Sequence, residues 1–278
     1  MSEFGRALSS WLARGETAVL VTVVATRGST PREAGTRMLV GADKTVGTVG
    51  GGRLEFEAVK AARALLESAE VTTTMDVPLG AAMGQCCGGH VVLRLERASP
   101  DLVERLAQLE FEEREAAPAV YLFGAGHVGK AIARALSLLP LRVSWIDNRA
   151  EEFPETLPDR IRQIVANHPP DLVAEAMPGA SFLVLTHSHA LDFDICEAVL
   201  ARGDFAYLGL IGSATKRRRF ERWYGARDHD AADLTRLTCP IGGGLARDKR
   251  PEVIAALVAA ELVVATVGAD TANLLSVR

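Results

Sequence analysis

The chain has 278 residues, a length that suits one large domain or two ordinary ones. An apolar content of 48% and a charged content of 24% are typical of a globular protein rather than a disordered or disulfide-rich one. The formal net charge of −4 argues against nucleic-acid binding, and no apolar run reaches the ~20 residues of a membrane span. The first residues lack a basic-then-apolar signal pattern, so we expect a cytoplasmic protein with reduced cysteines.

The first part of the chain predicts a small α+β domain, which we place at residues 1–98. Valine-rich runs alternate with turns that contain glycine and proline, and two stretches have helical patterns. We expect strands at 18–26, 36–40, 45–49, 71–75 and 90–94, and helices at 4–12 and 54–68.

An acidic, helical stretch at residues 99–117 ends just before Pro118 and is expected to be a linker helix. Beyond it, residues 118–278 alternate short apolar strands with helical patterns, which indicates a parallel sheet covered on both faces. We expect strands at 120–123, 141–146, 161–165, 181–185 and 205–211, with an apolar helix near the end of the chain.

The four cysteines are one adjacent pair and two single residues. Cys86 and Cys87 are adjacent within the glycine-rich run Gly84–His90, and neighbouring residues rarely form a relaxed disulfide because their Cα atoms lie only ~3.8 Å apart. Two free thiols with little bulk around them suit a soft metal centre or a sulfur-bearing ligand. The alternative is a glycine-rich turn with two small buried residues. Cys196 is expected in the core, and Cys239 belongs to a second glycine-rich loop.

The run Gly124-x-Gly126-x-x-Gly129 lies between an expected strand and an expected helix, and Asp147 ends the next strand. This is the context of the dinucleotide-binding fingerprint, so we expect a Rossmann-like domain. The second glycine would admit a pyrophosphate at the helix N-terminus, and Asp147 could accept hydrogen bonds from ribose hydroxyls. The same turn could instead serve packing alone, or hold a different phosphate.

Two histidines follow the fourth expected strand of the second domain, in the segment Thr186–His189, with Asp192 close behind. This places His187 and His189 at the carboxyl end of the sheet, where doubly wound folds bind ligands. They could bind a metal or act as acid and base, but no complete zinc ligand set is evident. Otherwise, one imidazole is hydrogen-bonded in its loop and the other is solvated.

The next strand is followed by Gly212 and by Ser213, a candidate N-cap whose neighbouring amides could hold an anion. The basic run Lys216–Arg219 is expected to be a solvated helix face, with a phosphate-binding or acidic-partner patch as the sharper hypothesis.

A second glycine cluster, Gly50-Gly51-Gly52, precedes Arg53 in the first domain. It follows a strand and opens a helix, so it could be a phosphate nest or simply a tight connection. Arg32, Arg37 and Arg53 are expected around it and could make bidentate contacts to an anion.

Six segments, in this order, together resemble the xanthine dehydrogenase accessory protein family, also called the XdhC/CoxI family. The resemblance extends over both halves of the chain, and the paired cysteines are its specific part. The matching segments are Arg27–Arg32, Gly47–Gly52, Gly84–Gly89, Gly124–Gly129, Thr186–His189 and Gly209–Ser213.

This resemblance implies a chaperone rather than an enzyme, with no catalytic residues of its own. Members of the family are implied to bind molybdenum cofactor (molybdopterin), to hold it while a cysteine desulfurase supplies the terminal sulfur ligand, and to insert it into an apo molybdenum hydroxylase such as xanthine dehydrogenase. Cys86 and Cys87 fall where the family's cofactor-associated cysteines lie, so they are the expected metal contacts. A homodimer is expected for this kind of carrier.

Two other functions remain open. An NAD(P)-dependent oxidoreductase would use the glycine fingerprint and Asp147, with His187 or His189 as acid and base, although no substrate site completes it. A metal-binding interaction module would draw on Cys86, Cys87, His90 and His187.

Overall fold

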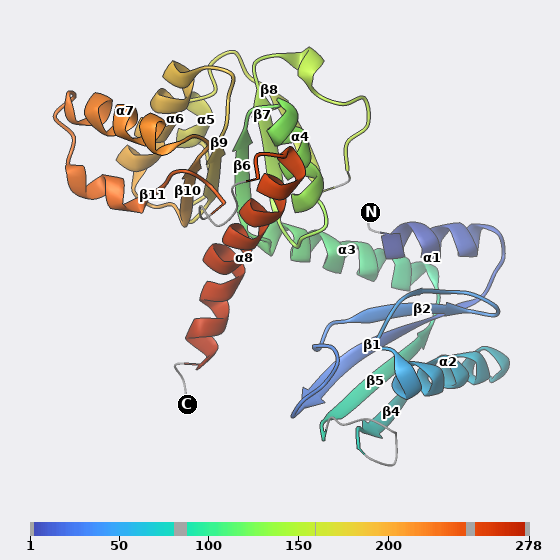
Figure 1. Ribbon diagram of the computed structural model, residues 1–278. Helices are drawn as coiled ribbons and strands as arrows, with labels where there is room; N and C mark the ends of the chain where they lie inside the picture. The colour runs from blue at the N-terminus through green and yellow to red at the C-terminus, as the bar shows by residue number, and fades with distance from the viewer. Residues whose placement is uncertain (1–2, 81–87, 159, 243–247, 276–278) are drawn as a thin grey trace. The chain divides into compact units, whose positions relative to one another are not determined.

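The computed structural model describes residues 3–80, 88–158, 160–242 and 248–275, with side chains described as far as residue 266 (Figure 1). The chain forms two compact units, Met1–Glu113 and Arg114–Arg278. Helix α3, Pro100–Ala116, runs across the boundary between them.

The first unit is built on a five-stranded antiparallel sheet in the order β3-β2-β1-β5-β4. Alternate side chains of a strand point to opposite faces, so the valine-rich pattern of β1 serves two helical layers. The α+β architecture expected for this part of the chain is confirmed. Its strands are β1 Ala18–Arg27, β2 Arg37–Gly41, β3 Thr45–Gly47, β4 Thr72–Pro78 and β5 His90–Arg97, and its other helices are α1 Glu3–Ala13 and α2 Gly52–Glu67.

Each face of this sheet has its own apolar core. Val19, Val21 and Val23 of β1 pack towards α2, in a cluster that includes the α2 residue Leu54. The intervening Leu20 points to the other face and joins a second cluster, built with side chains of α1 and the first half of α3.

The second unit contains a six-stranded sheet in the order β11-β10-β9-β6-β7-β8, and all neighbouring strands are parallel. Numbered along this unit, the order is 3-2-1-4-5-6 read from β8, which is the Rossmann arrangement. The expected doubly wound fold is confirmed. The strands are β6 Ala119–Phe123, β7 Arg142–Asp147, β8 Ile161–Val165, β9 Ser181–Val184, β10 Tyr207–Leu210 and β11 Leu237–Thr238.

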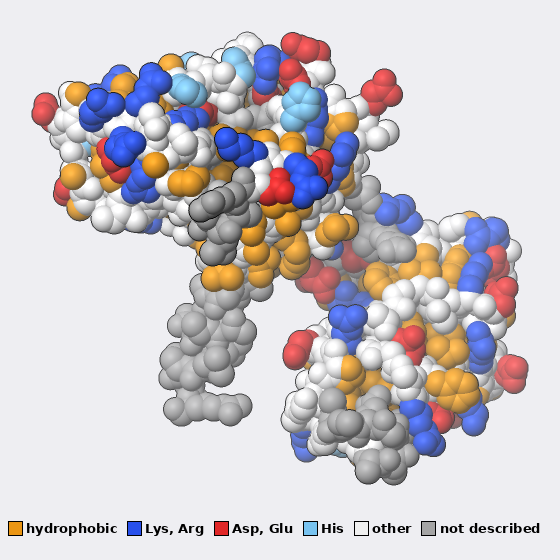
Figure 2. All heavy atoms as spheres, viewed as in Figure 1, with side chains coloured by type: hydrophobic (Ala, Val, Ile, Leu, Met, Phe, Trp, Pro, Cys, Tyr) orange, Lys and Arg blue, Asp and Glu red, His pale blue; other side chains and the backbone are white. Residues whose placement is uncertain are grey.

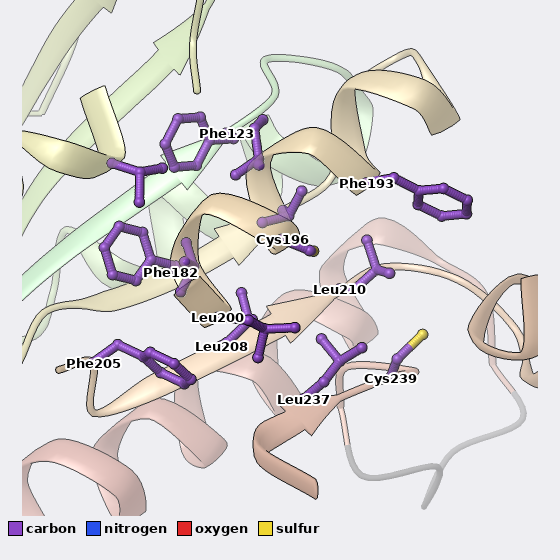
Figure 3. Close-up of a cluster of buried hydrophobic side chains, with 14 of the residues drawn as sticks. Phe123, Phe182, Phe193, Cys196, Leu200, Phe205, Leu208, Leu210, Leu237 and Cys239 are labelled. Atoms are coloured by element: carbon purple, nitrogen blue, oxygen red, sulfur yellow. The ribbon is translucent and has the colours of Figure 1, made fainter. Parts of the chain in front are cut away.

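Helices cover both faces of the parallel sheet. One face packs against α4 and α8, and the other packs against α5, α6 and α7. Figure 3 shows Cys196 of α6 among Phe182, Leu200 and Leu208 on the second face, as expected for a core cysteine. The helices are α4 His127–Leu136, α5 Asp171–Ala174, α6 His189–Arg202, α7 Ala214–Gly225 and α8 Pro251–Leu275.

Several elements differ from the sequence-based expectations. Strand β4 ends at Pro78 instead of residue 75, and β5 ends at Arg97 instead of residue 94. The strand expected at 45–49 ends at Gly47, whose φ of 80° belongs to the left-handed region and breaks the extended run. Strand β11 was not expected, because its two residues are too few to show a period. Within the described ranges, we find no helix long and apolar enough to cross a bilayer.

Candidate functional site

The candidate site of the second unit lies at the carboxyl edge of its parallel sheet. Strands β6 and β9 are neighbours there. From β6 the chain continues to β7 and β8 on one side, and from β9 it continues to β10 and β11 on the other, so the strand order reverses between them. Open α/β sheets bind ligands at this switch point. The loop after β6 carries the glycine fingerprint, the loop after β9 carries the histidines, and a Cβ added to Gly124 would collide with the carbonyl of Leu185, so the two loops touch.

The structural need for glycine differs among the three fingerprint positions. Gly124 has a φ of 118°, a left-handed value that favours glycine, and is pressed against the β9 loop. A Cβ on Gly129 would collide with the carbonyl of Gly124, so this glycine lets α4 pack close to β6. Gly126 has an ordinary φ of −69°, and a Cβ there would meet no protein atom within 4 Å. The protein itself does not require glycine at 126, and the space beside it adjoins the N-terminus of α4.

Asp147, at the end of β7, is only 4% exposed and its two oxygens are both engaged. The Ala125 N–H donates to Oδ2 at 2.7 Å, and Arg149 donates from its backbone N, Nε and Nη2, each at 3.0 Å. Burial acts to raise the pKa of Asp147, but the Arg149 side chain and these N–H donors outweigh it and leave the pKa below its usual value. The carboxylate therefore fastens the glycine loop to β7.

The floor under the glycine loop is fixed by further contacts. The indole N–H of Trp145 donates to the Gly124 carbonyl at 2.9 Å, and the ring packs edge-on against Phe153. Glu152 accepts from Nη1 of Arg149 and from Nζ of Lys130, both at 3.2 Å, which ties α4 to the segment after β7. Trp145 is thus placed to report on this loop.

A buried ion pair fixes the loop after β9 and the first turn of α7, on the other side of the switch point. Asp192 of α6 is fully buried and accepts at Oδ1 from both the N–H and the hydroxyl of Thr186, each at 2.8 Å. Its Oδ2 accepts from Nζ of Lys216 on α7, which is 8% exposed. The contacts of Asp192 therefore join the end of β9 to the first turns of α6 and α7.

The prediction of a solvated basic face was wrong for the first residues of α7. Lys216 points inward to its ion pair, and Arg217 donates to the carbonyls of Leu234 and Leu237 at 3.1 and 2.7 Å. Arg218 and Arg219 are exposed, and Figure 2 shows basic side chains gathered over α7. The sequence could not show which turn of this helix faces the sheet.

The remaining predicted residues of this unit lie at the same edge. His187 is exposed in the β9 loop, and His189 is the exposed first residue of α6. Ser213 is the N-cap of α7 and accepts from the Lys216 N–H at 3.4 Å. Their roles in binding stay predictions. Among the residues that the structure describes, no three His, Cys, Asp or Glu side chains form a group that could hold a metal ion.

The glycine cluster of the first unit already has acceptors for two of its amides. The Gly51 N–H donates to Glu55 Oε2 at 3.2 Å, and the Gly50 N–H donates to the Thr48 hydroxyl at 3.1 Å. Thr48 in turn bonds to the same Glu55 oxygen. A phosphate bound to the Gly50 and Gly51 amides would therefore meet the carboxylate of Glu55. Gly52 begins α2, and Arg53 pairs loosely with Glu57, at 3.9 Å.

Three of the six sequence segments meet within the first unit. A Cβ on Gly89 would collide with the carbonyl of Ser29, and one on Gly50 would lie 2.6 Å from Cγ of Pro31. The turn at 27–32 thus packs against both the second glycine cluster and the flank of the paired cysteines. Cys86 and Cys87 themselves lie outside the described residues, so their predicted role as metal contacts stays a prediction.

Sequence reasoning missed two groups that decide the chemistry of the glycine loops. Arg149 clamps Asp147, and its signal was the Asp-x-Arg spacing at the end of a strand. Glu55 accepts from the Gly51 amide of the second cluster, and its signal was a carboxylate in the first turn of the helix that the cluster opens.

Comparison with known proteins yields two family matches that follow one another along the chain. Residues 120–262 match the family described as the XdhC Rossmann domain, and residues 11–77 match the XdhC and CoxI family. The Escherichia coli (strain K12) "Uncharacterized protein YqeB" is 28% identical over 250 residues, which are 87% of this chain and 42% of YqeB. The chain therefore spans less than half the length of this curated relative.

The fold is shared with a solved structure. The crystal structure of a xanthine dehydrogenase (BH1974) from Bacillus halodurans matches with a TM-score of 0.73 at 19% sequence identity. The match covers 95% of this chain and 96% of the other.

Proposed function

Because this chain belongs to the XdhC and CoxI family, we propose that it is an accessory protein for xanthine dehydrogenase or a related molybdenum hydroxylase. It binds molybdenum cofactor, holds it while a cysteine desulfurase supplies the terminal sulfur ligand, and inserts it into the apo hydroxylase. The cofactor is cargo in this role, so the protein is a chaperone, and we propose that it acts as a homodimer.

The observation that carries the proposal is the open space at Gly126. Gly124 and Gly129 are explained by contacts within the protein, whereas a Cβ at 126 would meet no protein atom within 4 Å. A glycine that neither φ nor packing demands is explained by a ligand that approaches the backbone closely. The N-terminus of α4 begins at this point and favours a negatively charged group, such as the phosphate of a pterin cofactor.

The two glycine loops are not equally suited to that phosphate. At the second cluster, the Glu55 carboxylate already accepts from Gly51 and would repel an anion. At the fingerprint, the Asp147 carboxylate is paired with Arg149 and takes only the Ala125 amide of the loop. We therefore assign the phosphate to the loop Gly124–Gly129.

The packing of the first unit supports a role for the paired cysteines. The turn at 27–32 holds the flank of Cys86 and Cys87 through Gly89, and the same turn packs on Gly50. Three sequence segments of the family pattern thus share one region. Cys86 and Cys87 directly precede Gly88 in the chain, and their thiolates could ligate or protect molybdenum, a soft metal centre when bound to sulfur.

The alternative of an NAD(P)-dependent oxidoreductase has less support. In that role Asp147 would accept hydrogen bonds from ribose hydroxyls. Its two oxygens instead accept four hydrogen bonds from Ala125 and Arg149, and the residue is nearly inaccessible.

The test is the variant Gly126→Leu, with Gly225→Leu as its matched control. Gly225 also faces open space, but it ends α7 and lies at the far end of that helix from the site. Both variants should keep an unfolding free energy within about 1 kcal/mol of the parent, because a Cβ at either position meets no protein atom within 4 Å. Only Gly126→Leu should lose molybdenum cofactor on gel filtration, measured as molybdenum per chain, and fail to activate an apo hydroxylase.

Two further arms separate the parts of the proposal. Cys86→Ala/Cys87→Ala should weaken transfer to the apo hydroxylase, and unchanged transfer would remove the cysteines from the mechanism. A titration of NAD and NADPH against Trp145 fluorescence should show no saturable binding. Tight nucleotide binding that Gly126→Leu abolishes, together with unchanged cofactor transfer by that variant, would replace the chaperone by the oxidoreductase.

A further inference from the structure

A cavity of about 260 Å³ lies within the first unit, between α3 and the face of the antiparallel sheet that points away from α2. None of the six sequence segments contributes to its wall. Its floor is apolar, with the buried Leu20, Leu102 and Leu106. Its rim is polar and contains three arginines, so it combines two kinds of surface that a ligand could use.

The strand register brings two of these arginines to one row of the sheet. Thr22 of β1 pairs with Arg37 of β2 on one side and with Arg94 of β5 on the other. Residues directly opposite in adjacent strands point to the same face. Two guanidinium groups therefore flank one hydroxyl across three strands, and Arg105 of α3 adds a third from the helix side.

The residues that line the cavity include three cations, Arg37, Arg94 and Arg105, and one anion, Glu96. Glu96 accepts from Arg105 at 2.8 Å and lies 3.4 Å from Arg94, so one carboxylate serves two guanidinium groups. Arg37 donates to the two oxygens of Glu113 at 2.8 and 3.3 Å. Asp101 adds a second negative charge near Arg105. Among the described residues, Arg94 therefore has only a shared carboxylate, which favours an additional negative group beside it.

The two partners of the Arg37–Glu113 ion pair differ in exposure, so another anion could replace Glu113 beside Arg37. The Arg37 side chain is 14% exposed and fixed on a strand, whereas the Glu113 side chain is 58% exposed near the end of α3. An exposed carboxylate held by one ion pair contributes little stability and can be displaced. Arg37 would then present its planar fork to an incoming anion.

We propose that this cavity binds a small phosphate monoester with an apolar body. The phosphate lies over Thr22 between Arg37 and Arg94 and displaces Glu113, and the apolar body rests on Leu20, Leu102 and Leu106. Inorganic phosphate would contact the arginines but could not use the leucine floor, so it would fill only half of the site. This site is independent of the cofactor role proposed above, because the fingerprint loop belongs to the other unit.

The experiment is calorimetric titration of the full chain with phenyl phosphate, which has one ring and one phosphate. Phenol and inorganic phosphate are the half-ligands, and each should bind at least about tenfold more weakly because it uses one of the two surfaces. Arg37→Gln should weaken phenyl phosphate binding by about tenfold or more, the effect of losing a charged hydrogen-bond donor. Arg63→Gln, an exposed arginine of α2 outside the cavity wall, should leave it unchanged.

Glu113→Gln gives a prediction of opposite sign. Removal of the competing carboxylate should tighten phenyl phosphate binding by about two- to fivefold, in line with the small free energy of an exposed ion pair. Glu112→Gln, next to it and bonded to Gln108, is the matched control and should have no effect. The proposal is overturned if the parent shows no saturation by ~10 mM phenyl phosphate, or if Arg37→Gln binds as the parent does.

Discussion

Asp192 and Lys216 form a salt bridge in the interior of the second unit. Both are buried, and each charge would be costly alone in a low-dielectric interior. Three donors satisfy the carboxylate: the N–H and hydroxyl of Thr186, and the Lys216 ammonium. The pair therefore acts as a fastening between α6, α7 and the end of β9, next to the switch point.

Replacement of one partner should reveal this fastening. Asp192→Asn leaves the Lys216 ammonium buried without its counter-charge, so we expect a loss of about 3–5 kcal/mol in unfolding free energy, measured by urea denaturation. Asp194→Asn, an exposed position on the same helix, should change it by less than about 0.5 kcal/mol. Asp192→Asn/Lys216→Met should recover part of the loss. A loss below about 1 kcal/mol for Asp192→Asn would mean that Lys216 finds other partners or water.

The sequence was enough to identify several residues of the candidate site, but not which residues they contact. The glycines at 124, 126 and 129 were identified from their spacing, because the tight turn and close packing impose that spacing locally. Lys216 was misassigned because its burial depends on Asp192, which lies 24 residues away in the chain. Arg37 was expected near the second glycine cluster, but its side chain points to the sheet face shared with α3. Contacts between distant elements leave no local pattern.

Strand β7 and the loop before α4 are coupled through one carboxylate. Asp147 ends the strand, and its Oδ2 accepts from the Ala125 N–H of the loop. Arg149 holds the same carboxylate from the segment that follows the strand. The stability of this junction therefore depends on ionisation of Asp147.

The acid dependence of that junction has a definite sign. The pKa of Asp147 is lower in the folded protein than in the unfolded chain, so its contribution to stability is present above the unfolded value of about 3.9 and is lost as the pH falls through the folded value. The difference in unfolding free energy between the parent and Asp147→Asn should be largest near neutral pH and shrink below about pH 4. Urea denaturation followed by Trp145 fluorescence measures it, because the indole bonds to Gly124 in this loop.

The exposed Asp194→Asn variant is the control for this titration. Its difference from the parent in unfolding free energy should stay near zero, both at neutral pH and below about pH 4. A pH-independent difference for Asp147→Asn would mean that the amide reproduces the contacts of the carboxylate, and that ionisation does not matter at this junction.

The element pattern was largely predictable, for a physical reason. The inner strands β9 and β10 are buried at every residue, so each is a short apolar run bounded by turns. The edge strand β8 is mostly exposed, yet it was predicted with its observed bounds, Ile161–Val165. Strand β11 was missed because Leu237 and Thr238 contribute too little buried surface to form a run. The strand order follows from crossover rules rather than from the residues of any one strand.

At the scale of the whole chain, α3 links two units but also belongs to the core of one of them. Leu102 and Leu106, spaced i and i+4 on this helix, pack with Leu8, Trp11 and Leu20 of the first unit. The compact units divide after Glu113. The sequence suggested a linker at 99–117 from its acidic composition, which describes only the outer face of the helix.

The place of this boundary can be tested with two fragments, residues 1–98 and 1–113. The longer fragment retains both leucines, and each buried leucine is worth about 2–5 kcal/mol when truncated to alanine. We therefore expect 1–113 to unfold cooperatively in urea, and 1–98 to be less stable by several kcal/mol or unfolded. Leu106→Ala in the full chain separates the packing effect from the cut, and should destabilise the first unit alone. Equal stability of the two fragments would mean that residues 99–113 add nothing to the core of the first unit, as expected of a linker.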